Sequence, residues 1–170
     1  DGSAVVPLLG GHHGANDMAR KISELLGVDP AITTSGDIRF GIALDEPPEG
    51  FVLANPEDVK EFSVSMLAGE SLMISSDENH SSLDYVRGNK TIGSDHKQVF
   101  YNWLKVSNLP FSAFENLQIS LTSKAVSGSK EHLVYHPKTI VVGVGCERGT
   151  DPEELISLVS NTLKKNKIAP

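Results

Sequence analysis

Several features that mark other protein classes are scarce in this sequence of 170 residues. Its single cysteine excludes an internal disulfide and a zinc site built on several thiolates. No apolar run approaches the roughly 20 residues of a membrane-spanning helix, and no signal peptide is visible. Lys and Arg total 15 against 22 Asp and Glu, whereas a nucleic-acid-binding face needs an excess of basic residues. We therefore expect a soluble, cytoplasmic protein without nucleic-acid or membrane partners.

The start of the chain has the pattern of a strand, a glycine loop and a helix. Residues 4–9 are apolar and predict a buried strand, and residues 31–34 predict the next one. Asn16 is the predicted N-cap of the intervening helix, and Gly27 is its predicted left-handed end. The apolar face of this helix, by its spacing, comprises Met18, Ile22, Leu25 and Leu26.

The end of the chain repeats this pattern. Residues 139–145 are β-branched and almost entirely apolar, which predicts a strand buried on both faces. After the loop at residues 146–150, Asp151 is the predicted N-cap of a helix, with Pro152 at its first position. The predicted buried positions of this helix are Leu155, Val159, Thr162 and Leu163.

The middle of the chain, residues 45–137, differs from both ends. A helix is predicted after residues 55–58, and short strands are predicted at 72–74, 117–122 and 132–135. The last two are expected to form an antiparallel hairpin around a turn at residues 127–130. The predicted fold class is therefore α/β, with two strand-loop-helix units of Rossmann-like character flanking an α+β insert. The corresponding domain boundaries are residues 1–44, 45–137 and 138–170.

The glycine loop at residues 10–16 is the first candidate site. Glycines after a strand let backbone N–H groups converge on an anion, and the following helix adds the positive end of its dipole. His12 and His13 titrate near neutrality and are candidates for general acid–base catalysis. The residues expected to bind substrate here are Gly10, Gly11, Gly14 and Asn16. The alternative is a glycine turn that carries two exposed imidazoles.

The loop at residues 145–150 occupies the equivalent place in the second unit. Arg148 is a candidate clamp for a carboxylate, and Glu147 is a candidate base. Cys146 is either a nucleophile beside a helix N-terminus or a small buried residue at a strand end. Gly149 and Thr150 complete the predicted substrate-binding loop. The remaining histidines lack the spacing of a helical metal site, so no metal ligands are predicted.

Both loops carry a resemblance to a known family. Residues 6–19 with 30–34 resemble the end of the N-terminal domain of the CbiG family of cobalamin biosynthesis. Residues 42–47 resemble the entry to that family's middle domain, and residues 141–150 resemble the opening of its C-terminal domain. Because family members extend further on both sides, the chain is expected to be an internal fragment of a longer protein. Some relatives are fused to the precorrin-3B methyltransferase, so the resemblance allows the same fusion in the parent of this chain.

The resemblance implies a function in corrin-ring synthesis. Members of the family are cobalt-precorrin-5A hydrolases, in which water opens a δ-lactone and a two-carbon unit leaves as acetaldehyde. The implied partner is the cobalt-precorrin or another corrinoid, whose many carboxylates would have to meet positive charge from Arg20, Lys21 and Arg148. No cofactor is implied, because the cobalt belongs to the substrate. The alternative is a non-catalytic corrinoid-binding or accessory module of a fused methyltransferase.

Overall fold

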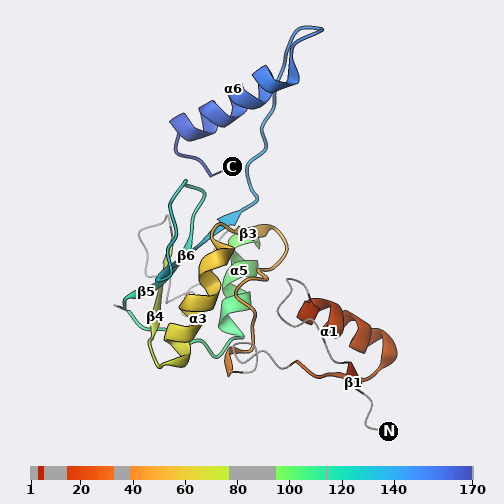
Figure 1. Cartoon of the computed structure of the whole chain (residues 1–170), viewed down its shortest axis with the longest axis vertical. Coiled ribbons are helices and arrows are strands. Elements are labelled where there is room, and N and C mark those ends of the chain that lie inside the picture. The colour runs from red at the N-terminus through yellow and green to blue at the C-terminus, as the bar shows by residue number, and fades with distance from the viewer. Residues whose placement is uncertain (1–3, 6–14, 33–38, 77–94, 114, 170) are drawn as a thin grey trace.

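A computed structural model describes residues 4–5, 15–32, 39–76, 95–113 and 115–169. These residues form a mixed α/β structure in which the central sheet lies between a smaller N-terminal unit and a C-terminal helix (Figure 1). None of the helices within the described residues is long and apolar enough to cross a membrane.

The N-terminal unit is a small strand-helix-strand arrangement. Strands β1 (Ala4–Val5) and β2 (Asp29–Pro30) pair in parallel and flank helix α1 (Ala15–Leu26). The helix prediction is confirmed, and Gly27 ends it with a φ of +65°, a conformation that glycine adopts without strain. The second strand lies earlier than predicted, at 29–30 instead of 31–34.

The buried face predicted for α1 is wrong. Met18 is 58% exposed and Leu25 is 85% exposed, whereas Ala19 and Ser23 are buried. The face of α1 that is buried therefore carries small and polar residues. The two short strands beside α1 cover little of the helix surface. The apolar stripe of α1 faces outward in the part of the chain that the structure describes.

The central sheet contains four strands in the order β3-β6-β5-β4. Strand β3 pairs antiparallel with β6, while the β6–β5 and β5–β4 pairs are parallel. Two helices, α3 and α5, pack against it, and the short 3-10 helix η1 precedes α3. The bounds are β3 Phe51–Leu53, η1 Pro56–Asp58, α3 Val59–Leu67, β4 Leu72–Ser76, α5 Asp95–Lys105, β5 Leu117–Leu121 and β6 His132–Pro137.

The predicted antiparallel hairpin of β5 and β6 is wrong, because these strands are parallel, with Gln118 opposite His132. The hydrogen-bonded turn lies two residues later than predicted, at residues 129–132, where the backbones of Ser129 and His132 are joined at 2.9 and 2.8 Å. Residues 122–131 have by then carried the chain back to the end of the sheet at which β5 begins. The turn therefore starts β6 in the same direction as β5.

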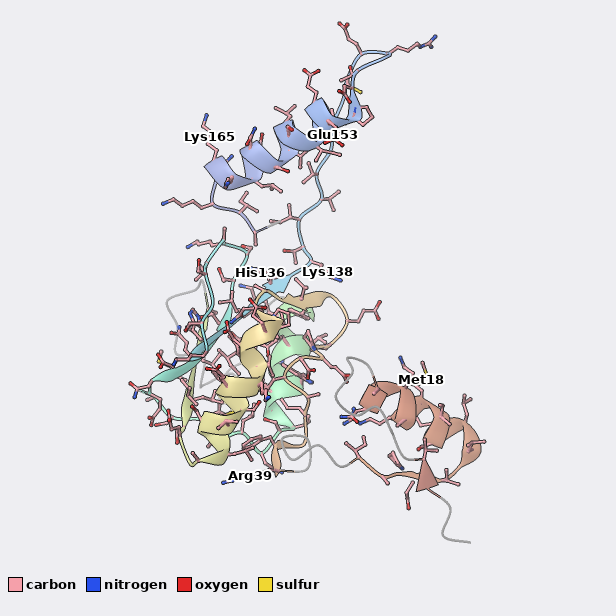
Figure 2. All side chains as sticks on the ribbon, in the orientation of Figure 1. Met18, Arg39, His136, Lys138, Glu153 and Lys165 are labelled. Carbon is pink, nitrogen blue, oxygen red and sulfur yellow. The ribbon has the colours of Figure 1, made fainter. Side chains whose placement is uncertain are left out.

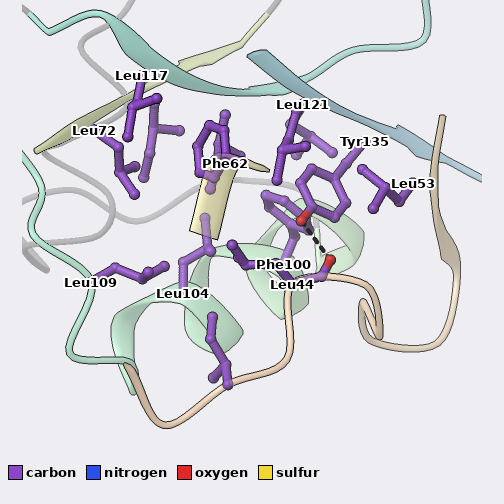
Figure 3. Packing of buried hydrophobic residues seen from close by; sticks show 14 of the residues in the cluster. Leu44, Leu53, Phe62, Leu72, Phe100, Leu104, Leu109, Leu117, Leu121 and Tyr135 are labelled. Atoms are coloured by element: carbon purple, nitrogen blue, oxygen red, sulfur yellow. Dashed lines mark hydrogen bonds between the residues drawn. The ribbon is translucent and has the colours of Figure 1, made fainter. Parts of the chain in front are cut away.

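One hydrophobic core joins the sheet to α3 and α5 (Figure 3). Because side chains alternate along a strand, Leu117, Ile119 and Leu121 of β5 all face these helices. Phe62 of α3 and Phe100 of α5 are fully buried against them. Each buried side chain of this size contributes about 1.5–3 kcal/mol relative to exposure, so this core holds the sheet and the two helices together.

The strand predicted at residues 139–145 does not form, which is the main correction to the expected fold. Val141 is 95% exposed, and residues 139–147 have neither helical nor strand structure. A β-branched segment becomes a strand only where a neighbouring strand takes its hydrogen bonds, and β3 pairs with β6 only as far as Pro137. The Rossmann-like character predicted for the second unit is thus not seen in the described residues.

Helix α6 (Pro152–Lys165) follows this extended segment. Asp151 is its N-cap, as predicted, and Oδ1 of Asp151 accepts a hydrogen bond from the backbone N–H of Glu153 at 3.1 Å. Leu155, Val159 and Leu163 are half-buried, but no residue of this fully described helix is buried. Beyond α6, the N–H of Ala125 donates to the Lys167 carbonyl and the N–H of Ala169 donates to that of Ser123, both at 2.9 Å.

Candidate functional site

A cleft of about 1140 Å³ lies between α1 and the segment that leads into the central sheet. Residues of α1 and residues from the range 41–56 line it, together with two residues that lie far from these in the sequence. Those two are Trp103 on α5 and Lys138 just after β6. The cleft is therefore assembled by the tertiary structure and not by one sequence motif.

The loop on one side of the cleft is held firmly by the core. Ile42 and Leu44 are buried, and the hydroxyl of Tyr135 donates a 2.7 Å hydrogen bond to the Leu44 carbonyl (Figure 3). Burial, together with the nearby charge of Asp45, raises the pKa of Tyr135 well above its usual range, so this hydroxyl remains a donor. The anchored loop thereby places Asp45 beside the cleft.

Cations reach the cleft from two other elements. Arg20, which is half-buried, and Lys21, which is exposed, are neighbours on α1, and both line the cleft. The backbone N–H of Lys138 donates to the Gly50 carbonyl at 2.8 Å, which continues the β3–β6 ladder by one residue and holds Lys138 at the rim. Figure 2 shows Lys138 at the end of β6 nearest the C-terminal segment.

The charges that line the cleft are balanced. Arg20, Lys21 and Lys138 supply three cations, and Asp45, Glu46 and Glu49 supply three carboxylates. The cations are suited to bind anionic groups of a ligand, and the carboxylates are suited to accept a proton or a hydrogen bond. The cleft therefore combines groups that can bind an anion with groups that can accept a hydrogen bond.

A second polar cluster lies on the face of the sheet that is turned away from the helices. Ser120 Oγ lies 2.7 Å from Ser75 Oγ and 2.6 Å from His132 Nε2, and Gln118 Nε2 donates to both serine hydroxyls. Burial lowers the pKa of His132. Hydrogen bonds among these four side chains link β4, β5 and β6 across the sheet.

The first sequence-predicted loop falls largely outside the described residues. This applies to His12 and His13 and to the three glycines Gly10, Gly11 and Gly14. Asn16 is described, and it is not the N-cap: it lies inside α1 and is 7% exposed. Burial of Asn16 against the N-terminal unit leaves little of its side chain accessible to a ligand.

The second sequence-predicted loop is described, and it lies away from the cleft. Cys146, Glu147 and Arg148 are all exposed. Gly149 has a φ of +91°, and the Thr150 hydroxyl donates to the Glu147 carbonyl at 2.9 Å, so these two residues shape the turn itself. The turn immediately precedes α6, which Figure 2 shows at the top of the view, apart from Met18 of α1 at the right.

Trp103 and Lys138 line the cleft although no motif of the sequence marks them. Trp103 packs against the core with Phe100 and Tyr135. Its helical spacing shows that it joins the buried face of α5, but nothing in the sequence shows that one edge of that face reaches a cleft. Arg20 and Lys21 were predicted to supply positive charge, and both line the cleft.

Comparisons with known proteins find similarity to proteins of cobalamin biosynthesis. A family model described as cobalamin synthesis G N-terminal matches residues 1–37. The cobalt-precorrin-5A hydrolase of Priestia megaterium is 26% identical over 165 residues, which cover 95% of this chain and 44% of that protein. Among solved structures, a cobalamin biosynthesis protein G homolog from Sulfolobus solfataricus is 20% identical and covers 98% of this chain and 44% of that one, with a TM-score of 0.29. The chain thus spans less than half the length of these relatives. The match to the family model over residues 1–37 and the similarity along almost the whole chain support the resemblance to the CbiG family.

Proposed function

We propose that this chain acts in corrin-ring synthesis, in the hydrolysis of the δ-lactone of cobalt-precorrin-5A with release of acetaldehyde. The observation that carries the proposal is the cleft beside α1, with Arg20, Lys21 and Lys138 on its walls. The name of the curated relative, a cobalt-precorrin-5A hydrolase, supports the choice of substrate.

The size of the cleft supports a large ligand. Pockets for small molecules commonly measure about 300–1000 Å³, and this cleft measures about 1140 Å³. A tetrapyrrole is larger than most such ligands and carries carboxylates around its edge. Arg20 and Lys21 lie on α1 and Lys138 follows β6, so cations at two separate places of the cleft suit an anionic ligand with several separated charges.

Lactone hydrolysis needs a base for the attacking water and donors for the oxyanion that develops. His12 and His13 immediately precede α1, the helix that carries Arg20 and Lys21, so we assign the base to one of these histidines. Backbone N–H groups of Gly10, Gly11 and Gly14 are the proposed oxyanion donors. Glu147 and Arg148, with the rest of their loop, remain candidates for a second contact with the substrate.

Binding and turnover test this proposal separately. The chain is titrated with hydrogenobyrinic acid, a metal-free corrin with free carboxylates, and with its fully amidated derivative. We expect tighter binding of the acid, and a loss of about tenfold to a hundredfold in affinity for Arg20→Gln and for Lys21→Gln. Lys165→Gln on α6 is the matched control, because this exposed lysine lies away from the cleft.

Turnover is then measured as acetaldehyde released from cobalt-precorrin-5A. Corrin binding with acetaldehyde release supports the hydrolase, and corrin binding without acetaldehyde supports the alternative, a corrinoid-binding module. Equal affinity for the acid and the amidated corrin would remove the basis for the cleft as the carboxylate site.

A further inference from the structure

Trp103 is a rigid aromatic surface at the cleft. It is half-buried, it lines the cleft, and it is the chain's single tryptophan. Its ring centroid lies 5.4 Å from that of Phe100 and 5.9 Å from that of Tyr135, at interplanar angles of 50° and 67°. Because Phe100 and Tyr135 are fully buried, they hold one side of the indole in place.

The elements around Trp103 restrict its position further. Leu104, the next residue of α5, is fully buried, and the Tyr135 hydroxyl is hydrogen-bonded to the loop that forms another part of the cleft. The aromatic cluster therefore links the base of the cleft to the loop that carries its acidic residues. An aromatic ring held in this way loses little conformational entropy when a ligand contacts it.

We propose that Trp103 is a stacking platform for the conjugated macrocycle, a role that rests on the proposed function. The indole contacts the apolar face of the ring, while Arg20, Lys21 and Lys138 bind carboxylates at its edge. This division of contacts follows from the chemistry of the ligand class, because a tetrapyrrole has an apolar face and a charged periphery. The cations and carboxylates that line the cleft are equal in number, so net charge does not attract the ligand to it. Contact between the indole and the apolar face of the macrocycle supplies that attraction instead.

The test uses substitutions that separate stacking from packing. Hydrogenobyrinic acid is the probe, because it lacks axial ligands that would shield the face of the ring. Affinities are measured for the wild-type chain, Trp103→Phe and Trp103→Leu, with Val99→Ala as a control at an exposed position of the same helix that does not line the cleft. Replacing an aromatic residue that stacks on a nucleic-acid base typically lowers affinity by about 5- to 150-fold. We expect Trp103→Leu to lower the affinity for the corrin by a factor in that range.

A spectroscopic readout distinguishes contact from a structural effect. Stacking on the indole should shift the visible absorption band of the bound corrin, and this shift should shrink in Trp103→Phe and vanish in Trp103→Leu. Urea unfolding shows whether each variant is folded, and Trp103→Phe, which retains an aromatic ring, keeps the test decisive if Trp103→Leu unfolds.

The outcomes separate the two proposals. Unchanged affinity together with an unchanged absorption band in both variants would overturn stacking and leave the proposed function standing. Failure of the wild-type chain to bind either form of the corrin would overturn both. A loss of affinity in Val99→Ala equal to that in Trp103→Leu would show a general effect on α5 and refute stacking.

Discussion

Replacing Gly128 by alanine should destabilise this protein far more than one added methyl group normally does. A Cβ at this position would lie closer to the Asn55 side chain than real Cβ atoms approach other atoms. The φ of Gly128 is outside the left-handed region, so alanine introduces no backbone strain there. The whole effect should therefore come from displacing Asn55.

The magnitude follows from what Asn55 holds. This residue is 5% exposed, and its Oδ1 accepts the backbone N–H of Val134 at 3.1 Å. Its Nδ2 donates to the carbonyl of His132 at 3.0 Å and to Oδ2 of Asp58 at 2.7 Å. Each buried polar group left without a partner costs about 1–3 kcal/mol. Displacing Asn55 leaves the Val134 N–H without this partner, whereas the His132 carbonyl keeps its hydrogen bond from the Ser129 N–H at 2.9 Å. With about 1–3 kcal/mol for the first loss and about 0.5–1.5 kcal/mol for the second, we predict a destabilisation of about 2–4 kcal/mol for Gly128→Ala.

A double-mutant cycle tests this reasoning. Urea unfolding is followed by Trp103 fluorescence for Asn55→Ala, Gly128→Ala and the double variant. Each single variant should lose about 2–4 kcal/mol, but the double variant should lose no more than Asn55→Ala alone, because the new methyl group then has space. Gly143→Ala, at a glycine with nothing near its would-be Cβ, is the control and should be close to neutral. Additive losses in the double variant would refute the proposed clash.

Three further predictions concern other contacts. Tyr135→Phe removes the donor to the Leu44 carbonyl and should lower the free energy of unfolding by about 1–3 kcal/mol, and an unchanged urea midpoint would contradict it. Burial lowers the pKa of His132, so the unfolded state binds the proton more readily and stability is lost as the pH falls below 6.5. His132→Gln should therefore lose less stability than the wild type between about pH 7 and pH 5, and parallel pH profiles in urea unfolding would show that His132 does not contribute. Asp151→Ala should weaken α6 by about 0.5–2 kcal/mol, seen as faster amide exchange in that helix, with the urea midpoint of the core unchanged. Unaltered exchange of the α6 amides would count against the cap.

Comparison of sequence and structure shows that local signals predicted local structure. Helix α6 begins after Asp151 because an N-cap and a following proline act within one turn of the chain. Gly27 ends α1 for an equally local reason, since its φ is +65°. Alternating apolar residues likewise predicted β5, because that pattern depends on one sheet face and not on the identity of the neighbouring strand. The resemblance to the CbiG family was also evident in the sequence, because the residues that carry it form contiguous motifs.

Only the tertiary structure decided which segments pair and which residues share the cleft. Residues 139–145 have the composition of a strand but form none, because strand formation depends on a partner elsewhere in the chain. The direction of β6 depended on the path of residues 122–131, which side-chain periodicity does not record. Trp103 and Lys138 are separated in sequence yet line the same cleft with Arg20, because the helix, the sheet edge and α1 are brought together by packing. Local propensity acts over a few residues, whereas strand pairing and cleft formation depend on contacts between distant parts of the chain.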